Sequence, residues 1–205
     1  MSKRSKWGKV HPTDAYYYRT DDFPFRDHSG VSPYKYCNHP PTLVMRGKGG
    51  GWELDVGEQW RVKEHALEYD MIVNLTGDSL FFKWGTLIPE RYQGLVKYRG
   101  GGHEDKGRER EIVIDWPNYG IPKLPFTFWE DLYIEMTRHP RVLLFCQGGH
   151  GRTGTAVCLL MLVSGAMETA KEAIQWVREN YCEKAVEGEQ QQKFIEEFER
   201  WLKKK

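Results

Sequence analysis

The sequence predicts a single α/β domain in which a mainly parallel central β-sheet is flanked by helices. Residues 71–75, 111–115 and 141–146 are short apolar runs with β-branched side chains, bounded by turn residues, as expected of buried parallel strands. Residues 126–139 place apolar side chains at helical spacing, as expected of a helix that covers one face of the sheet. A chain of 205 residues suits one domain with a full core.

The segment before these strands divides into an arm and a short strand. Residues 1–40 are polar and aromatic and show no sustained period, so we expect an irregular N-terminal arm packed on a domain that spans residues 41–205. Residues 42–46 predict a short strand. The glycine-rich run 47–51 lacks the Gly-Lys-Ser/Thr ending of a phosphate loop, which favours a flexible turn.

A second glycine-rich stretch, residues 98–110, is highly charged and predicts a solvated loop. It contains His103, Glu104 and Asp105, a cluster that could bind a metal ion. No matched ligands stand elsewhere in the sequence, so we expect no metal ion and no other cofactor.

Three helices are predicted in the last third of the chain. Residues 153–163 are apolar nearly all round, which indicates a buried helix. Apolar stripes at helical spacing within residues 170–181 and 194–202 predict two more helices whose apolar faces join the core.

The most informative run links the third strand to the buried helix and reads Cys-Gln-Gly-Gly-His-Gly-Arg-Thr-Gly over residues 146–154. Its glycines allow a tight turn with several N–H groups pointing inward, so the loop and the positive end of the next helix can hold a tetrahedral dianion. Arg152 can donate two hydrogen bonds to phosphate oxygens. The loop residues expected to bind the phosphate of a substrate are Gln147, Gly148, Gly149, His150, Gly151 and Arg152, and Asn118 is a further residue expected to contact the substrate. For His150, a packing or surface role at the turn is the alternative.

Cys146 begins this loop, where a helix N-terminus and an arginine stabilise the thiolate form of a cysteine. A thiolate can attack phosphorus to give a cysteinyl-phosphate, which water hydrolyses in a second step. Thr153 can donate its hydroxyl to the sulfur and ease thiolate departure. The alternative is a buried structural cysteine beside a tight turn, but the glycines, arginine, strand and helix all agree with the functional interpretation.

The run of Cys, five residues, Arg and Thr resembles the cysteine-dependent protein tyrosine and dual-specificity phosphatase superfamily. Residues 116–122, Trp-Pro-Asn-Tyr-Gly-Ile-Pro, resemble the family's mobile loop, which carries its general acid. Residues 185–191, with Phe194 after them, resemble its glutamine-bearing segment. The resemblance covers roughly residues 71–202 and implies a tyrosine phosphatase-like fold and a phosphatase-like catalytic domain.

The resemblance also bears on individual positions in these two segments. A glutamine, Gln191 or otherwise Gln190, is implied to position the water of the second step. The family places an aspartate where this chain has Asn118, and an amide cannot protonate a leaving oxygen. Asp115 is an alternative acid if the loop is shifted, or it turns the backbone after its strand. Asn118 otherwise indicates a low-activity or binding form, or an engineered trap.

Motif and resemblance together predict an enzyme, a cysteine-dependent phosphatase that hydrolyses phosphate monoesters. The substrate we expect first is phosphotyrosine in a phosphorylated protein, followed by phosphoserine or phosphothreonine. Phosphatases for RNA 5′ ends, inositol phosphates or another small molecule share this loop chemistry, and a basic, aromatic-lined groove at the cysteine would favour RNA. A phosphate-recognition module with little turnover is the alternative outside enzymes.

Charge, apolar runs and cysteine spacing limit the other partners. With 30 basic and 29 acidic residues the net charge is +1, so no global basic field favours nucleic acid or an anionic membrane. The N-terminus lacks an apolar signal core and no apolar run is long enough to span a bilayer, so we expect a cytoplasmic protein without a membrane partner. The cysteines lack the spacing of a metal site or a disulfide framework, and we expect reduced thiols at Cys37, Cys146, Cys158 and Cys182.

Overall fold

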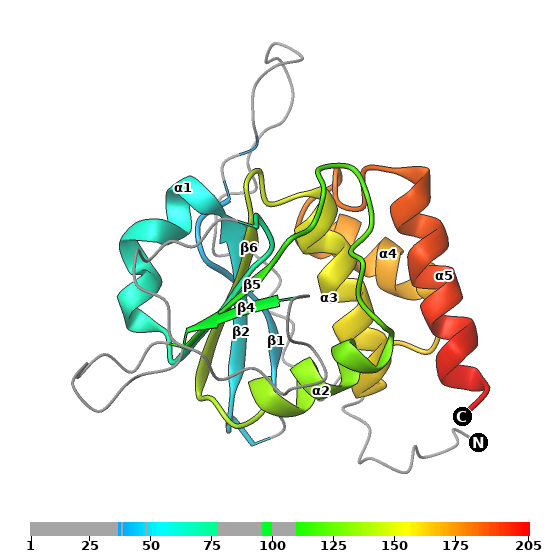
Figure 1. The fold of residues 1–205 in the computed structure, drawn as a ribbon, viewed down its shortest axis with the longest axis horizontal. Helices are drawn as coiled ribbons and strands as arrows, with labels where there is room; N and C mark the ends of the chain where they lie inside the picture. Colours follow the sequence, from blue (N-terminus) through cyan, green and yellow to red (C-terminus); the bar gives the residue numbers. More distant parts are fainter. Residues whose placement is uncertain (1–36, 38, 48, 78–95, 100–109) are drawn as a thin grey trace.

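The computed structural model describes residues 37, 39–47, 49–77, 96–99 and 110–205 (Figure 1). Its strands are β1 (Thr42–Arg46), β2 (Glu53–Glu58), β3 (Met71–Asn74), β4 (Val96–Arg99), β5 (Arg110–Ile114) and β6 (Arg141–Cys146). They pair into one sheet of order β1-β2-β6-β3-β5-β4. The four inner strands are parallel, and the edge strands β1 and β4 are antiparallel to their neighbours. The predicted mainly parallel sheet is confirmed.

Helices cover both faces of this sheet (Figure 1). They are α1 (Gln59–Val62), the 3₁₀ helix η2 (Lys63–Glu68), α2 (Thr127–Met136), α3 (Gly151–Ser164), α4 (Ala170–Asn180) and α5 (Glu189–Lys203). α1 and η2 lie on one face, and α2 to α5 lie on the other. Side chains of β6 alternate between the two cores: Val142, Leu144 and Cys146 join the larger one and Leu143 and Phe145 the smaller one. A strand buried on both faces needs the near-continuous apolar sequence that β6 has.

Two predicted helices differ from the observed ones at their ends. α3 begins two residues earlier than predicted, at Gly151, and ends at Ser164 because Gly165 adopts a left-handed conformation with a φ of 71°. α2 ends at Met136 rather than at residue 139, because the amides of Arg138 and His139 donate to the carbonyls of Glu135 and Met136, three residues back, in a turn that replaces the α-helical pattern.

The prediction of a solvated loop over residues 98–110 is wrong at both ends. Tyr98 and Arg99 belong to β4, and Arg110 is the first residue of β5. β4 is stabilised as a strand by its antiparallel pairing with β5, a distant contact that local composition does not reveal. The cluster at residues 103–105 lies outside the described residues.

The predicted glycine turn joins β1 to β2, which the sequence reading had not identified as a strand. Gly49 and Gly50 have φ values of 80° and 78°, and the amide of Gly50 donates to the carbonyl of Gly47 at 2.9 Å. The arm predicted over residues 1–40 lies outside the described residues except for positions 37, 39 and 40. Among the described helices, none has both the length and the apolar character needed to cross a bilayer.

Candidate active site

The loop after β6 lies at the carboxyl edge of the parallel strands, the edge at which open α/β sheets bind ligands. Cys146 is the last residue of β6, is buried, and pairs in register with Glu58 of β2. α3 begins at Gly151, so the amides of its first turn are available to an anion beside the loop. The predicted nucleophile and the predicted anion-binding helix end therefore meet at one place.

Gly149 fixes the shape of the loop. Its φ is 72°, and a Cβ added there would lie 2.9 Å from the hydroxyl of Tyr181 and 3.1 Å from the ring of His39. The Tyr181 hydroxyl donates to the Gly149 carbonyl at 2.6 Å. Burial, with the nearby Cys146 thiol, holds the pKa of Tyr181 well above its usual value, so this hydroxyl stays protonated as a donor. A residue larger than glycine at position 149 would be strained by this φ and would contact Tyr181 and His39 too closely.

Arg152 is buried in the first turn of α3. Its Nη1 donates to the carbonyls of Leu75 at 3.2 Å and Trp116 at 3.1 Å, which lie just beyond the ends of β3 and β5. Two carbonyls orient the guanidinium, and its other N–H groups remain for an acceptor in the loop. Thr153 is fully buried, but its hydroxyl has no hydrogen-bond partner among the described residues. The expected hydrogen bond from Thr153 to the sulfur of Cys146 is therefore not formed in this conformation.

A cavity of about 620 Å³ lies above the loop. The residues that line it are Glu58, Arg61, Asn118, Tyr119, Cys146, Gln147, Gly148, His150, Gly151, Arg152 and Glu187. Of the six loop residues expected to bind phosphate, five line the cavity. The sixth, Gly149, is buried and is not among the described residues that line the cavity. The loop thus presents the predicted nucleophile and arginine to one solvent-accessible space.

The segment over residues 116–122 closes one side of this cavity with a tight turn. Trp116 is buried, and its indole N–H donates to the carbonyl of Gly120 at 2.8 Å. The amide of Gly120 donates to the carbonyl of Pro117 at 3.0 Å. Between them, Asn118 and Tyr119 are exposed and line the cavity, and Tyr119 has a φ of 59°. The amide of Asn118 therefore lies where the family pattern places a carboxylic acid.

Asp115 lies outside this arrangement. It is exposed, and its carboxylate lies beside Gly77, where an added Cβ would be 3.1 Å from Oδ1. Asp115 is not among the described residues that line the cavity. In this conformation its position fits the backbone-turn interpretation better than the alternative-acid interpretation.

Gln191 is fully buried between the phosphate loop and the segment over 116–122. Its side-chain N–H donates to the carbonyl of Gly120 at 3.4 Å, and its side-chain oxygen accepts from the amide of Gly188 at 3.4 Å. A Cβ on Gly151 would lie 3.0 Å from both polar atoms of the Gln191 side chain, which places this amide against the loop. Gln190 is exposed. The structure places Gln191, and not Gln190, against the phosphate loop, although Gln191 is not among the described residues that line the cavity.

Glu187 places a carboxylate on the phosphate loop, a contact that the sequence reading did not predict. One of its oxygens accepts from the amide of Gly151 at 3.1 Å, and the other lies 3.6 Å from Nδ1 of His150. The amide of Gly151 is a group expected to bind phosphate, so an anion in the loop would meet the negative charge of Glu187.

Known proteins resemble this chain in sequence and in fold. The family model "Swiss Army Knife protein, DSP-PTPase phosphatase domain" matches residues 127–195. An uncharacterized protein of Methanocaldococcus jannaschii, MJ0215, is 36% identical over 170 residues, which are 82% of this chain and 81% of that protein. The chain belongs to the same family as MJ0215, and its residues 127–195 match a tyrosine and dual-specificity phosphatase domain.

Solved structures share the fold of this chain. The protein tyrosine phosphatase TcPTP1 of Trypanosoma cruzi superposes with a TM-score of 0.55 at 15% identity, covering 93% of this chain and 79% of that one. Tk-PTP in its active form gives 0.51 at 19% identity, covering 72% and 91%. At these identities the likeness concerns the fold alone.

Three charged residues of this site were not predicted from the sequence. Glu58 and Arg61 line the cavity and form an ion pair at 3.5 Å. Glu58 is the last residue of β2, a strand that was not predicted, and Arg61 lies in α1, directly after it. Recognising the alternating Leu54 and Val56 as a strand would have placed Glu58 at its carboxyl end. Glu187 stands within the glutamine-bearing segment, but nothing in its spacing indicates that it contacts the loop.

Proposed function

We propose that this chain is a cysteine-dependent phosphatase that hydrolyses phosphate monoesters through a cysteinyl-phosphate at Cys146. The observation that carries the proposal is that Cys146 and Arg152 line the same cavity, at the junction of a parallel strand and a helix N-terminus. A pure binding site needs the arginine and the amides but has no use for a thiol in this position.

Binding of the phosphoryl group would use the loop amides and the free N–H groups of Arg152. Carbonyls of Leu75 and Trp116 already hold one edge of the guanidinium, so little side-chain ordering is needed when phosphate arrives. Three equatorial oxygens of the transition state would then each face an N–H donor, which is the electrostatic requirement of phosphoryl transfer.

The chemistry would proceed in two displacements. The Cys146 thiolate attacks phosphorus, an S–P bond forms, and the bond from phosphorus to the ester oxygen breaks as the alcohol or phenol leaves. A water oxygen then attacks the same phosphorus, the S–P bond breaks, and the products are inorganic phosphate and the regenerated thiolate. Gln191, packed against Gly151, is the residue we assign to positioning that water.

The described part of the site offers no evident general acid to protonate the leaving group. Among the described residues that line the cavity, the carboxylates are Glu58 and Glu187, and Asn118 occupies the loop opposite the nucleophile. Glu58 pairs with Arg61 and Glu187 accepts from Gly151, so both carboxylates are engaged as acceptors. We infer that leaving groups that need protonation are turned over slowly.

Phosphotyrosine in protein is the substrate class that the cavity supports best. A volume of about 620 Å³ admits a phenyl phosphate, and the exposed ring of Tyr119 on the wall offers an aromatic contact. A phenolate also leaves with less proton assistance than an alkoxide. The charged lining residues balance, with Arg61 and Arg152 against Glu58 and Glu187, so the cavity is not the basic groove that would favour RNA.

A substrate panel with two variants tests the proposal. Phosphate release is measured from a phosphotyrosyl peptide, a phosphoseryl peptide, an RNA with a 5′ triphosphate and an inositol phosphate. We expect the phosphotyrosyl peptide to be hydrolysed fastest, and Cys146→Ser to lower the rate by at least about 10⁴-fold while still binding the peptide. Cys158→Ala is the matched control, because Cys158 is buried in α3 away from the cavity.

Each other outcome has a defined meaning. Turnover that persists in Cys146→Ser contradicts the covalent mechanism. Fastest release from RNA or inositol phosphate contradicts the assigned substrate class but keeps the mechanism. Tight binding of the phosphopeptide without turnover by the unmodified chain supports the phosphate-recognition module instead.

A further inference from the structure

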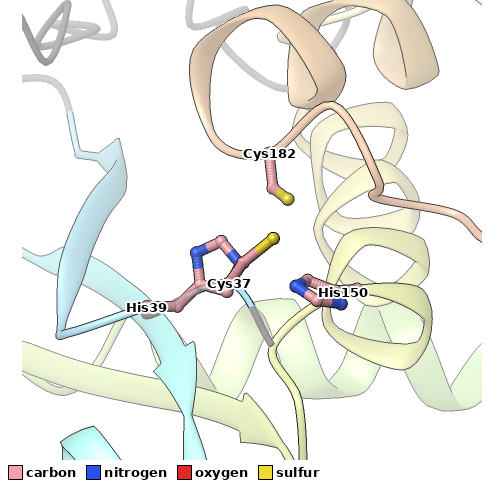
Figure 2. A group of neighbouring side chains, drawn as sticks. All are labelled: Cys37, His39, His150 and Cys182. Atoms are coloured by element: carbon pink, nitrogen blue, oxygen red, sulfur yellow. The ribbon is translucent and has the colours of Figure 1, made fainter. Parts of the chain in front are cut away.

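Two cysteines and two histidines meet behind the phosphate loop (Figure 2). Cys37 and His39 precede β1, His150 belongs to the loop, and Cys182 follows α4. One donor atom from each residue lies within 4.8 Å of the other three. All four residues are buried, with exposed fractions between 3% and 8%. Spacing along the sequence predicted no metal site, and the fold brings the donors together nonetheless.

The donor set is that of a tetrahedral zinc site. Two thiolates and two imidazoles are the Cys₂His₂ combination that structural Zn²⁺ sites use, and all four coordination positions are then filled by protein. Bonds of about 2.0 to 2.3 Å around a tetrahedral ion put its ligand atoms about 3.3 to 3.8 Å apart. Donors no more than 4.8 Å apart reach that geometry with inward shifts well under the length of one bond.

His150 supplies a second, independent observation. Its Nε2 is buried and has no hydrogen-bond partner among the described residues, which is costly for a ring nitrogen unless something binds there. Its Nδ1 lies 3.6 Å from the carboxylate of Glu187. A ligating histidine commonly gives its other N–H to a carboxylate, which orients the ring and raises its basicity. This arrangement leaves Nε2 for the metal.

The donors are held on rigid supports. The carbonyl of His39 accepts from the amide of Glu58 at 2.9 Å, at the end of β2. The amide of Cys182 donates to the carbonyl of Val177 at 3.0 Å, which ties it to the end of α4. The ring of His39 packs on Tyr181 with centroids 5.0 Å apart. Prearranged backbone of this kind lowers the ordering cost of binding an ion.

We propose that Cys37, His39, His150 and Cys182 bind one zinc-class divalent ion. The ion would join the segment before β1, the phosphate loop and the end of α4, and it would fix the position of His150 in the cavity wall. Metal binding does not rest on the proposed phosphatase activity, because the four ligands and their test involve no substrate.

A Cys37–Cys182 disulfide is the competing use of the same thiols. It would need neither imidazole, and it would not explain why two histidines turn toward the sulfur atoms (Figure 2). The four-residue arrangement therefore favours the ion.

Cobalt substitution tests the site directly. Tag-free protein is stripped with a chelator under reducing conditions and titrated with Co²⁺, followed by Zn²⁺ displacement, while metal content is measured by mass spectrometry. We expect one equivalent of Co²⁺ per chain, with the visible bands of tetrahedral cobalt and a near-ultraviolet thiolate-to-cobalt band that Zn²⁺ abolishes. This measurement on the unmodified chain does not depend on any variant folding.

Four variants locate the ion. Cys37→Ser and Cys182→Ser should lose the thiolate-to-cobalt band, whereas Cys146→Ser and Cys158→Ala should keep one full equivalent. Circular dichroism of the metal-free variants checks that they fold as the metal-free parent does. The proposal is overturned if the unmodified chain gives no tetrahedral cobalt spectrum, if Cys146→Ser removes the bound ion, or if Cys37→Ser and Cys182→Ser bind as the parent does. Loss of two titratable thiols in unreduced protein, with no cobalt spectrum after reduction, overturns it in favour of the disulfide.

Discussion

The phosphate loop over residues 146–152 and the segment over residues 116–122 both line one cavity. The loop has every side chain that the proposed reaction needs from it, whereas the segment lacks a carboxylic acid. The loop has its thiol, its arginine and a conformation fixed by Gly149 and Tyr181. The opposite segment keeps the tryptophan-anchored turn but presents an amide at Asn118. We therefore expect attack on phosphorus and protonation of the leaving group to be separable in this chain.

After Cys146→Ser, Arg152→Lys should give the largest effect, because it removes a planar donor that Leu75 and Trp116 hold in place. We expect kcat/KM for p-nitrophenyl phosphate to fall by about 10² to 10³-fold. Arg61→Lys is the matched control, since Arg61 lines the same cavity but pairs with Glu58. An unchanged rate in Arg152→Lys would mean that positive charge alone, and not the planar geometry of Arg152, supports the reaction.

Asn118→Asp should supply the general acid that the segment over residues 116–122 lacks. A carboxylic acid at this place would raise the turnover of an alkyl phosphate by about 10²-fold, with a smaller gain for p-nitrophenyl phosphate, whose leaving group scarcely needs a proton. Asp115→Asn should change either rate by less than about twofold, because Asp115 is exposed and lies outside the cavity lining. A selective loss on alkyl phosphates in Asp115→Asn would identify Asp115 as the acid.

Tyr181→Phe probes how the phosphate loop keeps its shape. The variant loses the hydrogen bond from the hydroxyl to the Gly149 carbonyl, worth about 1 kcal/mol, and keeps the ring that packs on His39. We expect the inhibition constant for inorganic phosphate to rise about fivefold. Unchanged phosphate inhibition would show that the positive φ of Gly149 is maintained without this contact.

Glu187→Gln should change phosphate inhibition by no more than Tyr181→Phe does, and in the opposite direction. It removes a negative charge from beside the Gly151 amide, so inorganic phosphate should inhibit up to about fivefold more tightly. Glu189→Gln, at an exposed position paired with Lys193, is the control and should leave the inhibition constant unchanged. Weaker phosphate inhibition in Glu187→Gln would mean that the carboxylate supports the loop more than it repels the anion.

Sequence alone predicted the strand, loop and helix around Cys146 because the signals that indicate these three elements are adjacent in the sequence. β6 is apolar throughout, its glycines permit the turn, and α3 follows directly. β2 was missed because Glu53–Glu58 mixes acidic residues and a glycine with its two buried apolar positions, and its strand character comes from pairing with β6.

The remaining site residues are brought together by the fold. Glu187 reaches the loop from the connection before α5, and Cys37 and Cys182 approach His150 from opposite ends of the chain. No spacing rule relates such positions, since their distances depend on the path of the sheet and helices between them. At Asn118 the sequence was enough, because it shows an amide where the family has an acid. The structure adds that Asp115 is not among the described residues that line the cavity.

A rapid-mixing time course with p-nitrophenyl phosphate at high enzyme concentration tests the central claim most directly. The account predicts a burst of nitrophenolate close to one equivalent per chain, followed by slow turnover, because Cys146 and Arg152 are in place while proton transfer is impaired. Absence of both burst and turnover would contradict the claim that Cys146 acts as a nucleophile.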